Sequence, residues 1–528
     1  MRHASTALVL AALGTLVACD RNNAAKSSAP AAAAAAAPKS CDDLRALALP
    51  NTTIFAVEAV ATGAFKSPGP AFGPGADFSK LPAFCRVMGS IKPSADSDIR
   101  FEVWLPAERW NGKFMQTGNG GAAGSIVYTS LAEPLARGYA VANTDTGHQQ
   151  GGAGDFGWAA GHPEKVTDFA YRAVHELTVV GKAVTAARYG KAAERSYWNG
   201  CSTGGRQGLK EAQRFPDDYD AIIAGAPANN WSALMGFSIS VQRNMTGPDA
   251  LPANKVGVLT EAAIAACDAR DGVVDRVIGQ PKLCSFDPAS TQCAAGKTEG
   301  CLTPTEVAAA KRIYAGVVTT DGTVLMPGTG PASETLWAAY ASPQFSIGTS
   351  SFRNVVVNDP TWDPATFDVD RDVARAEAKD GGAAKAMDPD LSAFFAHGGK
   401  LIMYHGTADG LIPYGNSVNY YESVIAKLGA DAVKDHAALY LVPGMSHCGG
   451  GEGASEIDWI GALERFDSTG KPLVPLAASH SARQPGPPGV PVAPGKAFMR
   501  PVCLYPQLAR YKGQGDETDS ASWECAAQ

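Results

Sequence analysis

The sequence predicts an α/β fold in which a mostly parallel sheet, covered by helices on both faces, is interrupted by a large insertion. Strand-like runs alternate with helical segments between Cys41 and about Ala228, a pattern typical of parallel sheets with helical crossovers. From about Asn229 to Phe395 the chain is rich in Gly, Pro, Ser and Thr and has only short periodic segments. Strand-like runs then return, so the two flanking parts should form one core.

The expected strands are short runs of apolar residues, at 101–105, 113–116, 139–143, 196–199, 220–224, 400–405 and 438–442. Helices are expected from about Asp168 to Tyr189, where apolar residues recur at helical spacing, and from Arg206 to Phe215. The chain has 528 residues, more than one typical domain of about 100–200 residues. We therefore expect a core of 41–228 and 396–528 with an inserted domain, called the lid here, over 229–395.

The first residues are typical of an export signal. Arg2 and His3 precede an apolar run from Ala7 to Val17, which is too short to span a bilayer. We expect a signal peptide over 1–18, followed by a low-complexity tether over 19–40 that includes an alanine run. Residues 16–19 resemble the lipobox of bacterial lipoproteins, which predicts lipidation of Cys19 and a periplasmic or cell-surface location. An ordinary cleaved signal peptide, and hence secretion, is the alternative.

Charge and cysteine usage narrow the class of protein further. The net charge of −7 leaves no basic footprint for nucleic acid, so nucleic-acid binding is not expected. The only membrane contact expected is through the N-terminal lipid anchor. Without Cys19 the chain has ten cysteines, and an even count in an exported chain suggests five disulfides. Zinc binding by these cysteines, the alternative to disulfides, is disfavoured, because the chain has no CxxC pair and its histidines do not cluster with the cysteines.

A Gly-x-Ser-x-Gly motif at 200–204 lies between an expected strand and an expected helix. Glycines two before and two after the serine allow the sharp turn that exposes a nucleophile in α/β-hydrolase folds. We therefore expect an α/β-hydrolase fold with Ser202 as the nucleophile. The N–H of Thr203, at the start of the helix, is the first candidate for the oxyanion hole. A second candidate is Gly120, in the glycine-rich loop after 113–116, although a plain turn would have the same composition.

The base and its partner are expected in loops that follow two late strands. His447 lies in a glycine-bounded loop after 438–442, and Asp409 follows 400–405, which matches the order Ser, Asp, His of this fold. Asp409 would orient the imidazole; the alternative is a turn or cap residue. His405, at a strand end, is a weaker candidate for the base and is expected to have a structural role.

Two cysteines test this assignment independently. Cys201 precedes the proposed nucleophile and Cys448 follows the proposed base. If the serine and histidine meet, the cysteines beside them fall within disulfide distance. We therefore expect a Cys201–Cys448 bond, which would hold the two catalytic loops together.

An acidic loop lies within the lid. Asp268, Asp271 and Asp275 surround a glycine, and hard oxygen ligands at this density suit calcium, with the Val273 and Val277 carbonyls completing the shell. The spacing is not that of an EF-hand, and solvated turn aspartates would have the same pattern.

The segments Gly200–Arg206 and Pro443–Cys448, together with the acidic loop, resemble the tannase and feruloyl esterase family over nearly all of the mature chain. The resemblance implies a structural Ca²⁺ held by the five acidic-loop residues named above. It also implies the pairs Cys201–Cys448, Cys41–Cys85, Cys267–Cys284, Cys293–Cys301 and Cys503–Cys525.

The same resemblance implies a serine carboxylic ester hydrolase that acts through an acyl-enzyme. Its expected substrates are small esters of hydroxycinnamic, gallic or terephthalic-type aromatic acids, held between core and lid. Candidates for the aromatic wall are Trp337, Tyr340, Phe345 and Phe352, unless they form the lid's own core. A serine peptidase on the same scaffold and a non-catalytic, calcium-stabilised surface lipoprotein are the alternative functions.

Overall fold

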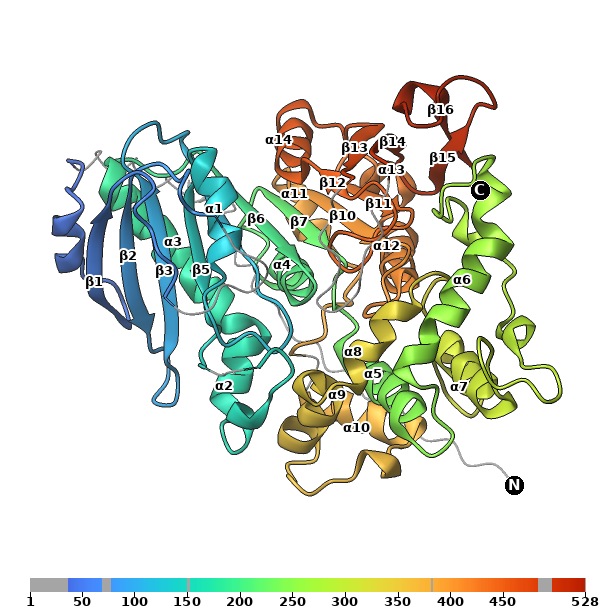
Figure 1. Cartoon of the computed structure of the whole chain (residues 1–528). Coiled ribbons are helices and arrows are strands. Elements are labelled where there is room, and N and C mark those ends of the chain that lie inside the picture. Colours follow the sequence, from blue (N-terminus) through green and yellow to red (C-terminus); the bar gives the residue numbers. More distant parts are fainter. Residues whose placement is uncertain (1–36, 69–76, 150–151, 381–382, 483–495, 528) are drawn as a thin grey trace, which may run out of the picture. The chain divides into compact units, whose positions relative to one another are not determined.

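Nine strands form the central sheet of the computed structural model, in the order β1-β2-β3-β5-β4-β6-β7-β10-β11 (Figure 1). The structure describes residues 37–68, 77–149, 152–380, 383–482 and 496–527. The strands are β1 (Thr52–Val60), β2 (Phe84–Ile91), β3 (Ile99–Pro106), β4 (Lys113–Thr117), β5 (Ala140–Thr144), β6 (Arg195–Cys201), β7 (Ala221–Gly225), β10 (Lys400–Gly406) and β11 (Ala437–Val442). Each of the seven strands expected from the sequence is present.

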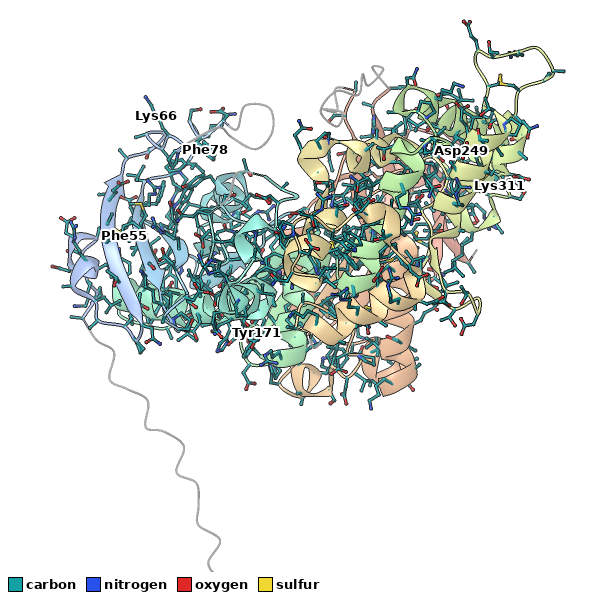
Figure 2. All side chains as sticks on the ribbon, turned by 90° about the horizontal axis from the view of Figure 1, so that it is seen from below. Phe55, Lys66, Phe78, Tyr171, Asp249 and Lys311 are labelled. Carbon is teal, nitrogen blue, oxygen red and sulfur yellow. A yellow bond between two sulfur atoms is a disulfide. The ribbon has the colours of Figure 1, made fainter. Side chains whose placement is uncertain are left out.

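Parallel pairing connects the six strands from β5 to β11, whereas β1, β2, β3 and β5 pair antiparallel. The prediction of a mostly parallel sheet is therefore correct, and the antiparallel edge is an addition to it. Phe55 of β1 is exposed at this edge (Figure 2).

Helices cover both faces of the sheet, because residues of the parallel strands alternate between two apolar clusters. In β10, Leu401 and Met403 pack into one cluster, while Ile402 and Tyr404 pack into the other. The helices of the core are α1 (Tyr128–Ala136), α2 (Pro163–Thr167), α3 (Ala173–Tyr189), α4 (Thr203–Arg214), α12 (Tyr414–Leu428), α13 (Ala430–Val433) and α14 (Trp459–Thr469). Residues of α3, α4 and α12 lie in the first cluster and those of α14 in the second.

The two helices expected in the core differ in detail from the prediction. The long helix begins with a π-helical turn at Asp168–Arg172 and continues as α3, which ends where Gly190 adopts a left-handed conformation with φ 71°. Helix α4 begins at Thr203, three residues earlier than expected. Its amino end therefore directly follows Ser202.

The chain leaves the sheet after β7 and returns at β10. The intervening elements are α5 (Trp231–Thr246), α6 (Val256–Cys267), α7 (Pro304–Ala315), β8 (Val317–Val318), β9 (Val324–Met326), α8 (Trp337–Ala341), α9 (Ile347–Ser351), α10 (Val369–Asp380) and α11 (Ser392–Ala396). Most of their buried apolar side chains share one cluster with side chains from the segment 156–170. The boundaries of the lid as a separate domain stay a prediction.

The C-terminal part adds small sheets to the core. Strands β12 (Glu456–Ile457), β13 (Leu476–His480) and β14 (Phe498–Val502) form one, and β15 (Gln507–Tyr511) pairs with β16 (Trp523–Ala527). The C-terminal segment therefore ends in a pair of antiparallel strands. At the other end, the predicted signal peptide, Cys19 and residues 19–36 of the tether lie outside the described residues. Lys39, assigned to the tether, is hydrogen-bonded to Ala187 at the end of α3.

Candidate active site

Ser202 occupies the turn between β6 and α4 in a strained conformation, with φ 63° and ψ −123°. A non-glycine residue adopts a positive φ only where its surroundings enforce it. Here the Ser202 N–H donates to the Gly225 carbonyl of β7 at 2.9 Å, and the turn has no room for side chains on either side. A Cβ on Gly200 would lie 2.5 Å from the Gly204 carbonyl oxygen, and one on Gly204 would lie 3.0 Å from the Gly118 Cα. The glycines of the motif thus permit the turn.

The glycine-rich loop after β4 is held against this turn by several hydrogen bonds. The Gly204 N–H donates to the Asn119 carbonyl at 2.7 Å, and the Thr203 hydroxyl donates to the Gly121 carbonyl at 2.7 Å. The Asn119 N–H donates to the Gln207 side-chain oxygen, and the Gln207 amide donates to the Asn119 side-chain oxygen, both at 3.1 Å. The loop is therefore fixed relative to the start of α4.

Two backbone N–H groups in this region are available to a ligand. Among the described residues, neither the Thr203 N–H nor the Gly120 N–H donates a hydrogen bond. The Thr203 N–H lies at the amino end of α4, where the helix dipole favours negative charge. Both residues named from the sequence for the oxyanion hole thus retain a free donor.

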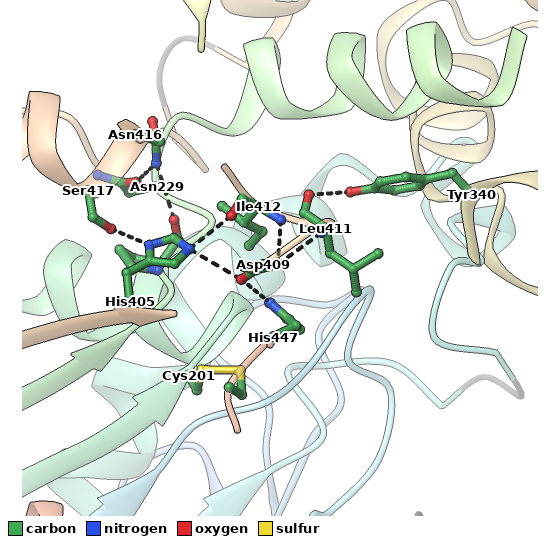
Figure 3. Close-up of polar contacts among 12 residues, drawn as sticks. Cys201, Asn229, Tyr340, His405, Asp409, Leu411, Ile412, Asn416, Ser417 and His447 are labelled. Carbon is green, nitrogen blue, oxygen red and sulfur yellow. Dashed lines mark hydrogen bonds and ion pairs between the residues drawn. A yellow bond between two sulfur atoms is a disulfide. The ribbon is translucent and has the colours of Figure 1, made fainter. Parts of the chain in front are cut away.

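His447 and Asp409 lie in direct contact (Figure 3), with the His447 Nδ1 2.7 Å from the Asp409 Oδ2. The Asp409 side chain is fully buried, and its Oδ1 accepts the N–H groups of Leu411 and Ile412, each at 2.9 Å. Burial by itself would raise the pKa of this carboxyl, but the charge of His447 and hydrogen bonds from both neighbouring histidines hold that pKa well below its ordinary value. Asp409 is therefore a buried carboxylate that orients one edge of the imidazole.

His405 contacts the same Asp409 oxygen as His447 does. Its Nε2 lies 2.9 Å from the Ile412 carbonyl oxygen and 3.2 Å from the Asp409 Oδ2. Because a carbonyl only accepts, Nε2 must carry a proton. The other ring nitrogen lies 2.8 Å from the Ser417 hydroxyl. His405 is completely buried, so its contacts suit a structural partner of Asp409 rather than a second base.

A disulfide joins Cys201 to Cys448, with their Cα atoms 6.0 Å apart. Ser202 and His447, their neighbours in the chain, therefore lie on two loops that are covalently connected. Within the described residues, the Ser202 hydroxyl makes no hydrogen bond, and such contacts often tighten only when substrate binds. The other pairs are Cys41–Cys85, Cys267–Cys284, Cys293–Cys301 and Cys503–Cys525. All five disulfides agree with the sequence prediction.

The aromatic residues considered for a substrate wall are mostly buried within the lid itself. Trp337, Tyr340 and Phe352 are exposed by 0%, 3% and 0%, and Phe345 packs against Tyr340 with ring centroids 5.6 Å apart. For Trp337 and Tyr340 the structure favours the alternative, because the lid's own apolar cluster covers both side chains. Phe352 lines a small cavity together with Phe156 and Trp231, so its place in an aromatic wall stays a prediction. The Tyr340 hydroxyl also donates to the Leu411 carbonyl at 2.6 Å, next to the Asp409 turn (Figure 3).

The acidic loop is folded tightly on itself. The two Asp268 oxygens accept the N–H groups of residues 275 and 276, and the Asp271 Oδ1 accepts that of Val273 at 3.1 Å. Burial, together with the charges of its acidic neighbours, raises the pKa of Asp271 to about 7. Arg500 pairs with Asp275 at 2.5 Å. Among the described residues, the Val273 and Val277 carbonyls accept no hydrogen bond. Desolvated carboxylates beside free carbonyls fit a hard cation.

Comparison with known proteins places this geometry in context. The family model described as tannase and feruloyl esterase matches residues 85–526. The chain belongs to the tannase and feruloyl esterase family. It is 35% identical over 550 residues to an uncharacterized esterase of Xanthomonas campestris pv. campestris, covering 93% of this chain and 91% of that protein. Membership of this family makes the protein a carboxylic ester hydrolase of the α/β type.

Solved structures of family members are also similar to this chain. Feruloyl esterase B from Aspergillus oryzae matches with a TM-score of 0.83 and 30% identity, over 92% of this chain and 99% of that one. A tannin acyl hydrolase from Aspergillus niger matches with a TM-score of 0.75 and 25% identity, over 93% and 95% of the two chains. Five disulfides are typical of exported proteins. Within the described residues, no helix is both long and apolar enough to cross a membrane.

Three residues that support the site carry no recognisable signal in the sequence. Asn119 and Gln207 are far apart in the chain, and their reciprocal pairing depends on how the loop after β4 meets α4. Ser417, in α12, reaches His405 only because α12 packs beside β10. A single polar residue in a loop or helix has no pattern that would identify such a partner.

Proposed function

We propose that this protein is a serine esterase that cleaves esters of aromatic acids of the hydroxycinnamic, gallic or terephthalic type. The observation that carries the proposal is the contact of His447 with the buried Asp409 carboxylate, together with the disulfide that joins the His447 loop to the strained turn bearing Ser202. The substrate class follows from family membership and from the relatives described as feruloyl esterases and as a tannin acyl hydrolase.

In the proposed mechanism His447 takes the proton of Ser202 as the hydroxyl oxygen attacks the ester carbonyl. The Asp409 carboxylate holds the imidazole with its other nitrogen toward the serine and stabilises the imidazolium. The N–H groups of Thr203 and Gly120 donate to the oxyanion. His447 then returns the proton to the departing alcohol, and water releases the acid from Ser202 by the same steps.

The test is a panel of methyl gallate, methyl ferulate, methyl p-coumarate and monohydroxyethyl terephthalate assayed on the mature chain and on Ser202→Ala. The substitution should lower turnover by about four to six orders of magnitude with an unchanged melting temperature. Fluorophosphonate should label the wild type alone. Substantial activity in the variant would remove Ser202 from its role, and cleavage of peptides but not of esters would favour the peptidase.

The acidic loop is proposed to hold a structural Ca²⁺ through Asp268, Asp271, Val273, Asp275 and Val277. Its support is the donor set, which combines carboxylates with unused carbonyls. When bound, the ion would neutralise buried negative charge and brace the lid. It takes no part in the chemical step.

The export route is also a proposal. We infer that Cys19 is lipidated after removal of residues 1–18, so that a tether holds the enzyme at a membrane surface in the periplasm or outside the cell. Labelling with a radioactive fatty acid, compared between the wild type and Cys19→Ser, tests this. Label retained in the variant, or label absent from both, would favour an ordinary secreted enzyme.

A further inference from the structure

A cluster of possible metal ligands, separate from the acidic loop, lies at the carboxyl end of α4, the helix that follows Ser202. His175 of α3, Glu211 of α4 and Asp218, in the connection from α4 to β7, each place one ligand atom within 4.8 Å of the others. The His175 Nδ1 lies 2.7 Å from the Asp218 Oδ2. The His175 ring stacks on Phe215 with centroids 3.8 Å apart and planes 9° apart. The three groups thus converge from separate segments, and the imidazole is held in place.

Glu211 is the unusual member of this cluster. The residue is exposed by 1%, and neither of its carboxylate oxygens meets a hydrogen-bond donor within the described residues. Buried carboxylates without donors are rare, because their desolvation is not offset. Burial and the facing Asp218 carboxyl raise the pKa of Glu211 well above its usual value. The carboxyl groups of Glu211 and Asp218 face each other in this buried environment, so they must either share a proton or bind a cation.

Two cations lie near enough for their charge to favour ionised Glu211, but within the described residues neither donates a hydrogen bond to its carboxylate. The Lys182 ammonium donates to the Asp218 main-chain carbonyl, and the Arg214 guanidinium lies 4.1 Å over the ring of Tyr171, which is labelled in Figure 2. Glu211 also lies in the last turn of α4, where the helix dipole disfavours an anion and favours a cation. A cation bound between Glu211 and Asp218 would therefore offset the buried negative charge of these carboxylates.

We propose that His175, Glu211 and Asp218 bind a divalent transition-metal ion such as Zn²⁺, at a structural site separate from the acidic loop. One imidazole nitrogen and two carboxylate oxygens form a set that Zn²⁺ accepts, whereas Ca²⁺ prefers oxygen ligands alone. His175 and Asp218 side chains are exposed by 31% and 15%, which leaves a route for the ion and open positions for water.

Binding needs only small adjustments in this arrangement. Ligand atoms around tetrahedral zinc lie about 3.3 Å apart, so the side chains must shift by roughly 1–1.5 Å from their present separations. To bind the ion through Nδ1, the neutral His175 imidazole must carry its proton on Nε2. The ion would then connect α3, α4 and the segment leading to β7.

The test measures binding of ZnCl₂ to the mature chain by calorimetry, in saturating Ca²⁺ so that the acidic loop is occupied. One Zn²⁺ per chain is expected, with a rise in melting temperature. Glu211→Gln should weaken this binding at least about 100-fold, since loss of even an outer partner costs 10–100-fold. Glu176→Gln, a matched change on the same helix as His175, should leave the affinity within about twofold.

His175→Gln is a second variant for the case that Glu211→Gln does not fold, because the histidine side chain is partly exposed. It should abolish the same binding event. X-ray absorption of the zinc-loaded wild type should show one imidazole among oxygen ligands. Absence of stoichiometric binding by the wild type would overturn the proposal. So would a protonated-carboxyl infrared band at neutral pH that persists with ZnCl₂ and disappears in Glu211→Gln, because it would identify a shared proton instead.

Discussion

The Cys201–Cys448 disulfide should matter for stability and, separately, for catalysis. It closes a segment of 247 residues, for which the chain-entropy relation gives about 5.5 kcal/mol of stabilisation at 25 °C. Two shorter disulfides inside the segment, spanning 17 and 8 residues, change the logarithm of its length very little. Cys41–Cys85 closes 44 residues and should contribute about 4 kcal/mol by the same relation. Both figures are upper estimates.

The double variants Cys201→Ala/Cys448→Ala and Cys41→Ala/Cys85→Ala form a matched pair. Both should lower the melting temperature, the first somewhat more. Only the first should lower turnover per folded molecule, by about 10- to 100-fold, because displacement of catalytic groups by about 1 Å has effects of that size. The control should keep turnover within about twofold, since Cys85 lies in β2 at the antiparallel edge of the sheet.

Active-site titration with a fluorophosphonate gives the concentration of competent enzyme, and steady-state hydrolysis of the best ester gives turnover. Both are measured well below the melting temperature, after circular dichroism has established that each variant is folded. If the two double variants retain equal turnover, the disulfide does not align Ser202 with His447, and the reasoning fails.

Four further outcomes follow from the geometry. His405→Gln should lower kcat about 10-fold with KM within twofold, because Asp409 loses a hydrogen-bond partner; an unchanged kcat would make His405 irrelevant to catalysis. The pKa of Asp409 is lowered in the folded protein, so ionised Asp409 should contribute its full stabilisation above its unfolded pKa of about 3.9. This stabilisation should be lost as the pH falls through the lower pKa of the folded protein. Urea unfolding at a series of pH values measures it. Gly118→Ala should cost about 1–3 kcal/mol of stability and lower kcat, because the new Cβ would lie 2.4 Å from the Gly204 Cα. Gly120→Ala is the control for stability, because a Cβ there meets nothing within 4 Å. Equal melting temperatures for these two variants would contradict the prediction. A chelator should lower the melting temperature by a few degrees and barely change kcat, as expected for loss of a bound ion worth about 2.7 kcal/mol at 100-fold excess over Kd; an unchanged melting temperature would argue against calcium.

Features that depend on local sequence were predictable. The strand, glycine turn and helix around Ser202 show up in consecutive residues, because the turn requires small residues at fixed offsets from the serine. The parallel strands β10 and β11 are apolar throughout, as expected for strands buried on both faces. The Cys201–Cys448 pair was predictable because each cysteine adjoins a residue with an independent chemical assignment.

Features that depend on contacts between distant segments of the chain were not predictable from the sequence. The edge strands β1 and β2 pair antiparallel with β3, and pairing direction is set by the path of the chain rather than by its composition. Aromatic residues such as Trp337 and Tyr340 look the same in a sequence whether they line a cleft or fill a core, so only their burial in the structure distinguishes the two.

The sequence by itself predicted the family and the residues of the candidate site: a glycine-framed serine, a histidine and an aspartate in the order of an α/β-hydrolase, with cysteines beside two of them. Tertiary structure decided which groups meet across the fold. It placed His405 against Asp409 and paired Asn119 with Gln207. It also brought His175 and Asp218 next to the Glu211 carboxylate, which meets no hydrogen-bond donor in the part of the chain that the structure describes. The physical reason is that hydrogen bonding and burial act between neighbours in space, and sequence patterns record only neighbours along the chain.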